Sequence, residues 1–328
     1  MLNIEQLSYW EKQTFFSDVD FLIIGAGIVG YSTAIHLREL HPTSKIVILE
    51  KGYLPSGASS KNAGFACFGS ATELIDDLQH TEKTLVWETV AKRWEGLRYL
   101  KQLIGESDLD LEVNGSWDLI TKPEEQTVIS VRDQLSNLNS ELFKITGEQG
   151  VYAEDPNLHA KFGFENLSTS FFNRLEGQIN TGKMIRRFYQ KAVEQNIDIL
   201  FGINVINYEA LLHTVKVNTS VGEINARNLL ICVNGFAQDL MNEDVHPARA
   251  QVLVTEKIQN LKIKGTFHYD EGFYYFRNLG NRLLLGGARN KDFKNEKTYS
   301  LETSTKIQKV LEDFMMQHIL PKGAKKPK

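Results

Sequence analysis

The stretch that decides the fold is Asp20-Phe-Leu-Ile-Ile-Gly-Ala-Gly-Ile-Val-Gly30, near the start of a 328-residue chain. After Asp20, four apolar residues, Phe21-Leu-Ile-Ile24, form a short run that suits a strand buried on both faces. The glycine pattern G-x-G-x-x-G follows at once, and residues 31–40 have helical character until Pro42 ends the helix. A second apolar strand, Lys45-Ile-Val-Ile-Leu49, leads to Glu50. The sequence therefore predicts a strand–helix–strand unit with a glycine-rich turn.

Each glycine of this turn has its own physical role. Gly25 permits a tight turn, Gly27 lets the backbone approach a pyrophosphate, and Gly30 allows the helix to pack closely on the strand. The free N–H groups from Ile28 onward and the positive end of the helix dipole favour phosphate. Glu50 ends the second strand, where a carboxylate accepts both hydroxyls of a ribose and disfavours a 2′-phosphate. The unit is therefore predicted to bind a dinucleotide.

Residues 51–70 distinguish between the two common dinucleotides. An NAD-binding domain would continue soon with another buried strand, whereas small residues dominate this stretch. A small-residue segment suits a backbone that lies against a large, flat, anionic cofactor, with Ser59, Ser60 and Asn62 available as donors. The apolar run Phe65-Ala-Cys-Phe68 argues against an exposed loop. This segment favours FAD.

The same segment resembles a known family. Gly57-Ala-Ser-Ser-Lys-Asn-Ala-Gly-Phe65 is similar to the FAD-dependent amine and amino-acid oxidoreductases of the D-amino-acid oxidase/glycine oxidase superfamily. The resemblance covers about residues 18–290, through Glu176-Gly-Gln-Ile-Asn180, Leu230-Ile-Cys-Val-Asn-Gly235, Pro247-Ala-Arg-Ala-Gln-Val252, Tyr274-Tyr-Phe-Arg277 and Leu283-Leu-Leu-Gly-Gly-Ala-Arg289. It implies non-covalent FAD held by Gly25, Gly27, Ile28, Gly30, Glu50, Lys51, Ser59, Ser60, Asn62, Ala63, Gly64, Val205, Asn234 and Gly235.

The implied fold class is α/β, with a Rossmann-like FAD-binding domain interleaved with an α+β substrate domain built on an antiparallel sheet. The FAD-binding domain is expected at residues 18–75 plus 150–245 and the substrate domain at 76–149 plus 246–300. A helix and a basic tail are expected at 301–328, where the last eight residues carry four lysines.

Three elements of the substrate domain are expected from the sequence pattern. A long helix should start at Ser70 or Thr72 and run to about Ile104. Residues 109–120, interrupted by Asn114-Gly115, have the pattern of a β-hairpin with a tight turn. Another helix should cover residues 124–138.

The implied reaction removes hydride from a carbon bonded to nitrogen and delivers it to the flavin, after which the imine hydrolyses and oxygen or another acceptor reoxidises the flavin. Oxidation of a 2-hydroxy acid on the same fold is an alternative. A FAD-binding protein with little or no turnover is another, because family members continue past a helix such as residues 303–319 with a flavin-covering segment. This sequence has no counterpart to that segment, so a shortened chain is expected.

A substrate carboxylate would be bound by an arginine fork. Strand alternation places Phe273, Tyr275 and Arg277 on one face of a strand, so Tyr275 and Arg277 are predicted to orient the substrate. Arg249 lies where the family brings a strand past the flavin, and it is the third predicted residue. Cys67 is expected to be a small buried hydrophobic residue, with no covalent bond to the flavin.

Charge and composition exclude other classes. Lysine and arginine number 37 against 41 aspartate and glutamate, so the net charge of −4 gives no indication of nucleic-acid binding. The two cysteines, Cys67 and Cys232, form no motif with metal-ligand spacing, so no metal is predicted. No signal peptide or membrane span is evident, and a cytoplasmic protein is expected. The expected partner is a small amine or amino acid; neither the substrate's identity nor the oligomeric state follows from the sequence.

Overall fold

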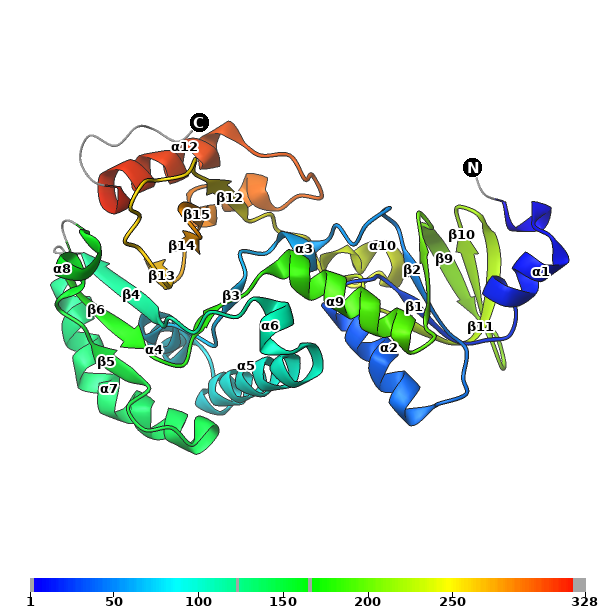
Figure 1. The fold of residues 1–328 in the computed structure, drawn as a ribbon, viewed down its shortest axis with the longest axis horizontal. Helices are drawn as coiled ribbons and strands as arrows, with labels where there is room; N and C mark the ends of the chain where they lie inside the picture. Colours follow the sequence, from blue (N-terminus) through cyan, green and yellow to red (C-terminus); the bar gives the residue numbers. More distant parts are fainter. Residues whose placement is uncertain (1–2, 122–123, 165–166, 321–328) are drawn as a thin grey trace. The chain divides into compact units, whose positions relative to one another are not determined.

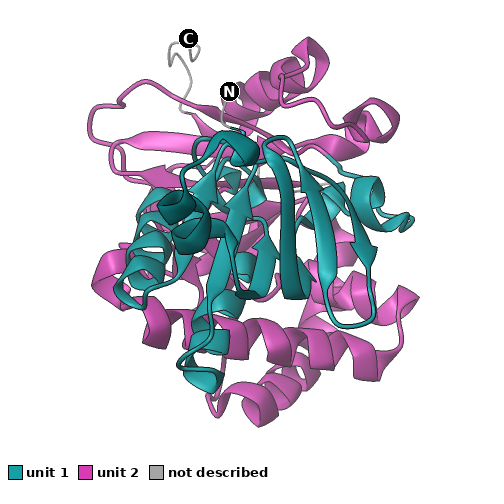
Figure 2. Ribbon diagram, turned by 90° about the vertical axis from the view of Figure 1, so that its right-hand side faces the viewer, with its two compact units in different colours: residues 1–62, 181–248 teal, residues 63–180, 249–328 magenta. Residues whose placement is uncertain are grey.

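The computed structural model describes residues 3–121, 124–164 and 167–320 (Figure 1). The basic tail predicted from the sequence, at residues 321–328, lies outside this range. The chain forms two compact units, and each is assembled from two separate stretches of sequence (Figure 2). Unit 1 comprises residues 1–62 and 181–248, and unit 2 comprises residues 63–180 and 249–328.

Unit 1 is built on a six-stranded sheet with the order β8-β2-β1-β11-β10-β9. The first four strands in this order are parallel, whereas β10 runs antiparallel to both of its neighbours. Its described elements are η1 (Ile4–Gln6), α1 (Tyr9–Glu11), η2 (Lys12–Phe16), β1 (Val19–Ile24), α2 (Ile28–Leu40), β2 (Ile46–Glu50), α3 (Ala58–Lys61), α9 (Thr181–Glu194), β8 (Asp198–Phe201), β9 (Val205–Ala210), β10 (Val215–Thr219), β11 (Gly222–Ile231), η3 (Asn234–Phe236) and α10 (Gln238–Met241).

The strand–helix–strand unit predicted from the glycine pattern is present. Strands β1 and β2 are parallel neighbours, and α2 connects them and lies beside α9 (Figure 1). Residues Leu22 and Ile23 of β1 are fully buried although they point to opposite faces, which is why this strand is apolar from Phe21 to Ile24. Tyr31 of α2 is also fully buried and stacks on Phe188 of α9, with ring centroids 6.1 Å apart. Helices thus cover one face of the sheet and keep the glycine turn in place.

Unit 2 is built on a seven-stranded mixed sheet with the order β12-β15-β14-β13-β4-β6-β5 and a separate ribbon of β3 and β7. Its described elements are β3 (Phe65–Ala66), α4 (Ala71–His80), α5 (Lys83–Ile104), α6 (Glu106–Leu109), β4 (Ser116–Thr121), α7 (Glu125–Thr146), β5 (Tyr152–Glu154), α8 (Leu158–Phe162), β6 (Leu167–Asn173), β7 (Gly177–Gln178), β12 (Gln251–Val254), β13 (Thr266–Tyr269), β14 (Tyr274–Leu279), β15 (Arg282–Gly287), η4 (Arg289–Lys291), α11 (Phe293–Glu296), α12 (Thr305–Phe314) and η5 (Met315–Ile319).

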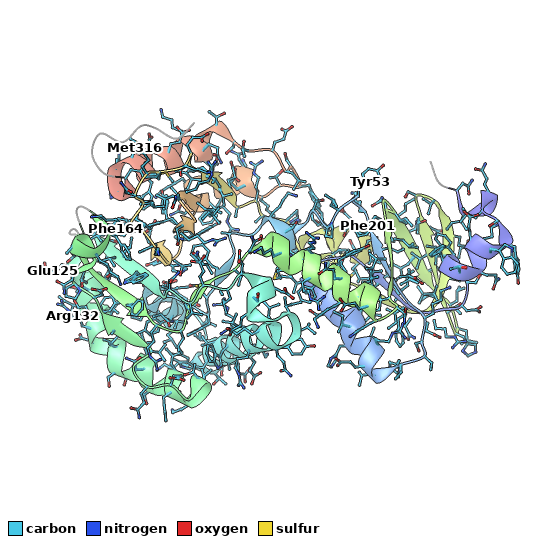
Figure 3. All side chains as sticks on the ribbon, in the orientation of Figure 1. Tyr53, Glu125, Arg132, Phe164, Phe201 and Met316 are labelled. Atoms are coloured by element: carbon cyan, nitrogen blue, oxygen red, sulfur yellow. The ribbon has the colours of Figure 1, made fainter. Side chains whose placement is uncertain are left out.

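The two faces of this sheet carry different side chains. One face is apolar and aromatic: Phe267 of β13 stacks on Phe276 of β14, with centroids 4.7 Å apart. Phe164, labelled in Figure 3, packs edge-on against both rings. Helix α12 and η5 contribute Leu311 and Met315 to the same cluster. The opposite face bears helices α4, α5 and α7 over one part. Over β13 and β14 that opposite face carries polar side chains, described below.

The predicted long helix is two helices in the structure. Ser70 does cap α4, through a capping box with Glu73, but the helix ends at His80 and Thr81 adopts an extended conformation. Helix α5 then runs from Lys83 to Ile104. Both helices contact α7, and the break lets each present its apolar residues to that helix. The spacing of the apolar residues predicted helical structure correctly. It could not show that one helix ends at His80 and a second begins at Lys83.

The predicted hairpin over residues 109–120 was wrong. Only residues 116–121 form a strand, β4, and its partners are β6 and β13, which are distant in sequence. Glu112 instead makes an isolated bridge to Gln178. Gly115 has a φ of 86°, as a tight turn requires, but its N–H bonds to the carbonyl of Glu176. A turn sequence is therefore present without the strand that should precede it.

The boundaries between the units differ from the predicted domain boundaries. Residues 63–75 and 150–180, expected in the FAD-binding domain, belong to unit 2. The reason is the ribbon: Phe65 pairs with Gln178, which ties the two segments to each other within unit 2.

Candidate functional site

The glycine turn of unit 1 is packed too tightly for side chains. Gly25 has a φ of 104°, and a β-carbon there would lie 2.6 Å from the carbonyl oxygen of Cys232. A β-carbon on Gly30 would lie 1.9 Å from the carbonyl oxygen of Gly25. Gly27 is the N-cap of α2 and has no side chain to cap it; a β-carbon there would lie 2.9 Å from Ser59 Oγ. For Gly25 and Gly30 the obstacle to a side chain is backbone, and for Gly27 it is the Ser59 side chain.

Glu50 is fixed against this turn. Its Oε2 accepts a hydrogen bond from the N–H of Ala26 at 3.0 Å, and its Oε1 accepts one from the N–H of Gly52 at 3.0 Å. A carboxylate has about four acceptor sites. The two bonds therefore orient Glu50 and leave it able to accept the hydroxyls of a ribose.

The segment after Glu50 folds into α3 and supplies the predicted polar groups. Ser59 Oγ accepts from the N–H of Ile28 at 3.0 Å, so it lies at the N-terminus of α2. Ser60 Oγ donates to the carbonyl of Pro55 at 2.6 Å, and Asn62 Nδ2 donates to the carbonyl of Ser59 at 2.8 Å. Lys51 is exposed. Ser59 is thus placed beside the helix end where a phosphate is expected.

Three more predicted residues lie elsewhere in unit 1. Val205 is buried at the start of β9. Asn234 adopts the left-handed conformation, with a φ of 51°, at the turn after β11. A β-carbon on Gly235 would lie 3.0 Å from Pro247, so the chain also passes closely there. Because β11 neighbours β1, its C-terminal turn lies at the same sheet edge as the glycine turn.

Ala63 and Gly64 begin unit 2, and both contact Arg277. The Nε of Arg277 donates to the carbonyl of Ala63 at 2.5 Å, and its Nη2 donates to the carbonyl of Ile179 at 3.2 Å. The N–H of Ile179 in turn donates to the carbonyl of Gly64 at 2.8 Å. Arg277 is 6% exposed, and burial lowers the pKa of its guanidinium. The arginine predicted to bind substrate thus already binds two backbone carbonyls.

Substitution of Gly64 should show how tightly this contact is packed. Gly64 has a φ of 74°, and a β-carbon would lie 2.4 Å from the carbonyl oxygen of Ile179. Gly64→Ala should therefore lower the free energy of unfolding by about 2 kcal/mol or more. Gly96→Ala, in the open middle of α5, should raise it by up to about 1 kcal/mol. Urea unfolding of both variants tests this; equal effects would contradict the packing.

Tyr275 lies on the polar face of the seven-stranded sheet. Its ring packs edge-on against Phe65, with centroids 5.5 Å apart, and Phe65 packs in the same way against His268 at 5.3 Å. Burial raises the pKa of Tyr275, so the phenol stays protonated at neutral pH. Tyr275 and Arg277 are two residues apart on β14 and share this face, as alternation along the strand predicted.

Arg249 is held by an ion pair. Its Nε and Nη2 donate to the two carboxylate oxygens of Glu296, both at 2.8 Å, and its Nη1 donates to the carbonyl of Glu302. The Glu296 side chain is 1% exposed. Gln251 Nε2 also donates to Glu296, at 2.8 Å. Arg249 thus belongs to a buried polar network, and its predicted role in orienting substrate stays a prediction.

A group of buried ionisable residues on the polar face was missed by sequence reasoning. Burial raises the pKa of Glu176 to about 7 and that of Asp118 to about 7. Burial also raises the pKa of the Cys67 thiol and lowers that of His268 to about 4. Glu176 was noted only as part of a family motif, and nothing in the sequence set His268 or Asp118 apart. Only the pairing of β3 with β7 and of β4 with β13 brings them together.

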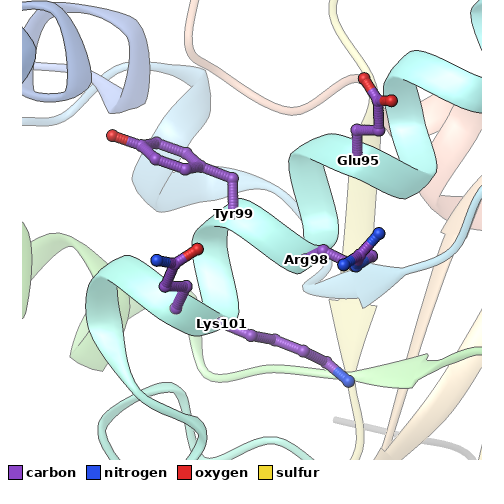
Figure 4. A pocket seen from close by; sticks show the side chains of 5 residues that line it. Glu95, Arg98, Tyr99 and Lys101 are labelled. Atoms are coloured by element: carbon purple, nitrogen blue, oxygen red, sulfur yellow. The ribbon is translucent and has the colours of Figure 1, made fainter.

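A surface depression on α5 contains none of the predicted site residues. It is open to solvent and is lined by five residues of that single helix, Glu95, Arg98, Tyr99, Lys101 and Gln102 (Figure 4). Side chains from one exposed helix cannot surround a ligand. We therefore assign no function to this depression.

The parallel sheet, its glycine turn and Glu50 define a dinucleotide-binding α/β protein. The particular family follows from the sequence as a whole: residues 20–324 match the profile of the FAD dependent oxidoreductase (DAO) family, and the chain belongs to that family. The predicted family and the predicted cofactor, FAD, are thereby confirmed. A comparison with curated protein sequences gave no match.

Solved structures confirm the predicted fold class. The chain is 17% identical to glycine oxidase from Bacillus cereus ATCC 14579, with a TM-score of 0.67 over 92% of this chain and 78% of that one. It is 15% identical to L-proline dehydrogenase from P. horikoshii, with a TM-score of 0.70 over 92% and 77%. It is 15% identical to iminodiacetate oxidase from Chelativorans sp. BNC1, with a TM-score of 0.67 over 90% and 78%. At these identities the similarity establishes the fold and leaves the substrate open.

The sequence predicted no membrane-spanning segment, and the helices of the structure can be compared with that prediction. Among the described residues, no helix combines the length and the apolar composition that crossing a bilayer requires.

Proposed function

We propose that the protein oxidises the C–N bond of an amino acid or amine. The observation that carries this proposal is the family match over residues 20–324, on a chain whose glycine turn and Glu50 keep the geometry of a dinucleotide site. The names of the structural neighbours, glycine oxidase, L-proline dehydrogenase and iminodiacetate oxidase, support a substrate that contains both nitrogen and a carboxylate.

The residues of unit 1 fit the adenosine-diphosphate part of FAD. The turn at Gly25, Gly27 and Gly30 has no room for side chains, and the N–H groups that follow Ile28 in the first turn of α2 can bind phosphate, while the N–H of Ile28 itself donates to Ser59. Glu50, oriented by two backbone N–H groups, can accept the ribose hydroxyls. We further propose that Ser59 lies beside the pyrophosphate. When bound, FAD supplies the hydride acceptor that the protein's own side chains lack.

On unit 2 the protein's task is to orient the substrate. We propose that the remaining N–H donors of Arg277 bind the substrate carboxylate and that the neutral phenol of Tyr275 donates a hydrogen bond to it. The carbonyls of Ala63 and Ile179 would then fix the guanidinium in advance, which reduces the entropy lost when substrate binds. Arg249 is proposed as a third orienting residue, although Glu296 already occupies one edge of its guanidinium.

A panel of substrates tests the proposed function. The purified protein is mixed without oxygen with amino acids, secondary amines and 2-hydroxy acids, and loss of the visible absorbance of the flavin is followed. We expect bleaching with a nitrogen-containing substrate and release of ammonia or a shorter amine on reoxidation. Bleaching by 2-hydroxy acids alone, or by no member of the panel, would overturn the proposal.

Arg277→Lys separates substrate binding from a purely structural role. A lysine keeps the charge but cannot bind a carboxylate through two parallel hydrogen bonds. We expect KM to rise about 10-fold or more for an amino acid and to change little for the matching amine that lacks the carboxylate. Steady-state kinetics with both substrates measure the ratio. An equal loss for both substrates, together with a lower Tm, would show that Arg277 only holds the backbone.

A further inference from the structure

Three residues of metal-ligating type meet inside unit 2. Cys67 follows β3 and Glu176 precedes β7, and the register of that ribbon, in which Ala66 pairs with Gly177, places the two residues opposite each other. His268 belongs to β13 of the seven-stranded sheet. One potential ligand atom from each of the three residues lies within 4.8 Å of the other two.

Among the residues that the structure describes, two of these side chains have buried atoms without a hydrogen-bond partner. Glu176 is fully buried; its Oε1 accepts from the N–H groups of Phe68 and Gly69, at 2.7 and 3.1 Å, whereas its Oε2 has no hydrogen-bond partner in the described part of the chain. His268 is 9% exposed, and its Nε2 likewise has none there. Buried polar atoms are nearly always paired in folded proteins. Two orphaned atoms in one cluster of ligating residues indicate a missing ligand.

The chemistry of the three groups selects the ligand. A sulfur, an imidazole nitrogen and a carboxylate oxygen form a set that suits Zn²⁺, whereas Mg²⁺ and Ca²⁺ require oxygen ligands. Bonds of about 2.0–2.3 Å would place the ligand atoms of a tetrahedral site about 3.3–3.8 Å apart. In the structure the three ligand atoms lie within 4.8 Å of one another, so small shifts of the side chains would bring them to that spacing. A fourth position is then left for a water molecule.

The surroundings of the cluster also fit a metal. A thiolate and a carboxylate balance the two positive charges of the ion, so the buried site would be neutral overall. The two backbone N–H groups on Oε1 orient the Glu176 carboxylate, and the ring of Phe65 packs edge-on against His268. The hydroxyl of Thr266 lies 3.7 Å from the sulfur of Cys67, where it can support a thiolate. Such outer contacts are typical of metal sites.

We infer that Cys67, Glu176 and His268 bind one Zn²⁺ ion. The ion would join the β3–β7 ribbon to the seven-stranded sheet of unit 2. This inference does not depend on the proposed function, because it concerns residues that hold the fold of one unit.

The test uses the full-length, tag-free holoprotein. The protein is treated with a chelator, given either Zn²⁺ or Mg²⁺, desalted and analysed for metal by mass spectrometry. We expect close to one zinc ion per chain, no retained magnesium, and a zinc X-ray absorption spectrum with one sulfur neighbour at about 2.3 Å. A spectrum without sulfur, or a chain that retains no zinc, would overturn the inference.

Matched cysteine variants identify the ligand. Cys67→Ser should weaken zinc binding at least 10-fold, and zinc should no longer raise its Tm. Cys232→Ser changes the other cysteine, a free and partly buried thiol in unit 1, and should keep the wild-type stoichiometry. His268→Gln provides a second loss-of-ligand variant if Cys67→Ser does not fold. Equal zinc binding by the wild type and by the variants at positions 67 and 268 would refute the assignment.

Discussion

Glu50→Gln is expected to weaken FAD binding by about 10- to 100-fold, because the hydrogen bonds of a charged carboxylate are worth about 1.5–3 kcal/mol. The carboxylate accepts from the N–H groups of Ala26 and Gly52 through its two oxygens. A glutamine has only one oxygen, so its NH₂ group must face one of these N–H donors. The substitution therefore disturbs the glycine turn and also removes the acceptor for the ribose hydroxyls.

The affinity is measured by adding FAD to flavin-free protein and following flavin fluorescence. Glu39→Gln is the matched control, because Glu39 lies on α2 of the same unit and its side chain is 56% exposed. The control should bind FAD as the wild type does. If Glu50→Gln bound FAD as tightly as Glu39→Gln, the assignment of Glu50 to the ribose would be wrong.

The dinucleotide part of the site could be predicted because its determinants are local. The strand, the three glycines and Glu50 lie within about 30 residues, and part of the close packing that requires glycine comes from the motif's own backbone. The close approach of Gly30 to the carbonyl of Gly25 is one example. A short motif whose geometry is set by its own backbone can be interpreted from sequence alone.

The partners of the arginines could not be predicted, because they come from distant segments. Strand alternation placed Tyr275 and Arg277 on one face, but it could not show that the carbonyls of Ala63 and Ile179 would meet the guanidinium. The same holds for Arg249, whose partner Glu296 lies 47 residues away. Periodicity predicts where a side chain points within its own strand; it contains no information about which chain segment covers that face.

The hairpin that was wrongly predicted shows the same limit. Asn114-Gly115 is a strong local turn signal, and Gly115 does adopt a positive φ of 86°. Yet β4 pairs with β13 and β6, because mixed sheets can draw neighbours from anywhere in the chain. The buried cluster of Cys67, Glu176 and His268 was invisible for this reason too, since only sheet pairing brings the three residues together.

Arg249→Met should lower the free energy of unfolding by about 3–5 kcal/mol, because it leaves a buried carboxylate without its cation. The Glu296 side chain is 1% exposed and would keep only neutral donors, such as the amide of Gln251 at 2.8 Å. Arg132→Met is the control: Arg132 also binds a carboxylate through two nitrogens, but its side chain is 55% exposed (Figure 3). Its loss should cost at most about 1 kcal/mol.

The penalty of Arg249→Met should also depend on pH. The hydrogen bond from Arg249 lowers the pKa of Glu296, so the pair stabilises the fold above the unfolded-state pKa, and this stabilisation is lost as the pH falls through the folded-state pKa. In the variant, burial without the cation should raise that pKa. The difference from the wild type should therefore be largest at neutral pH and smaller in mild acid. Urea unfolding at both pH values measures it, and a difference that does not vary with pH would contradict the buried pair.

The double variant Arg249→Met/Glu296→Gln separates stability from catalysis. Removing both charges relieves the unpaired carboxylate, so most of the lost stability should return. If Arg249 also orients the substrate, turnover of an amino acid should stay low in this refolded variant, with a raised KM. If turnover returns together with stability, Arg249 serves only to hold the chain near Glu296, and orientation of the substrate is left to Tyr275 and Arg277.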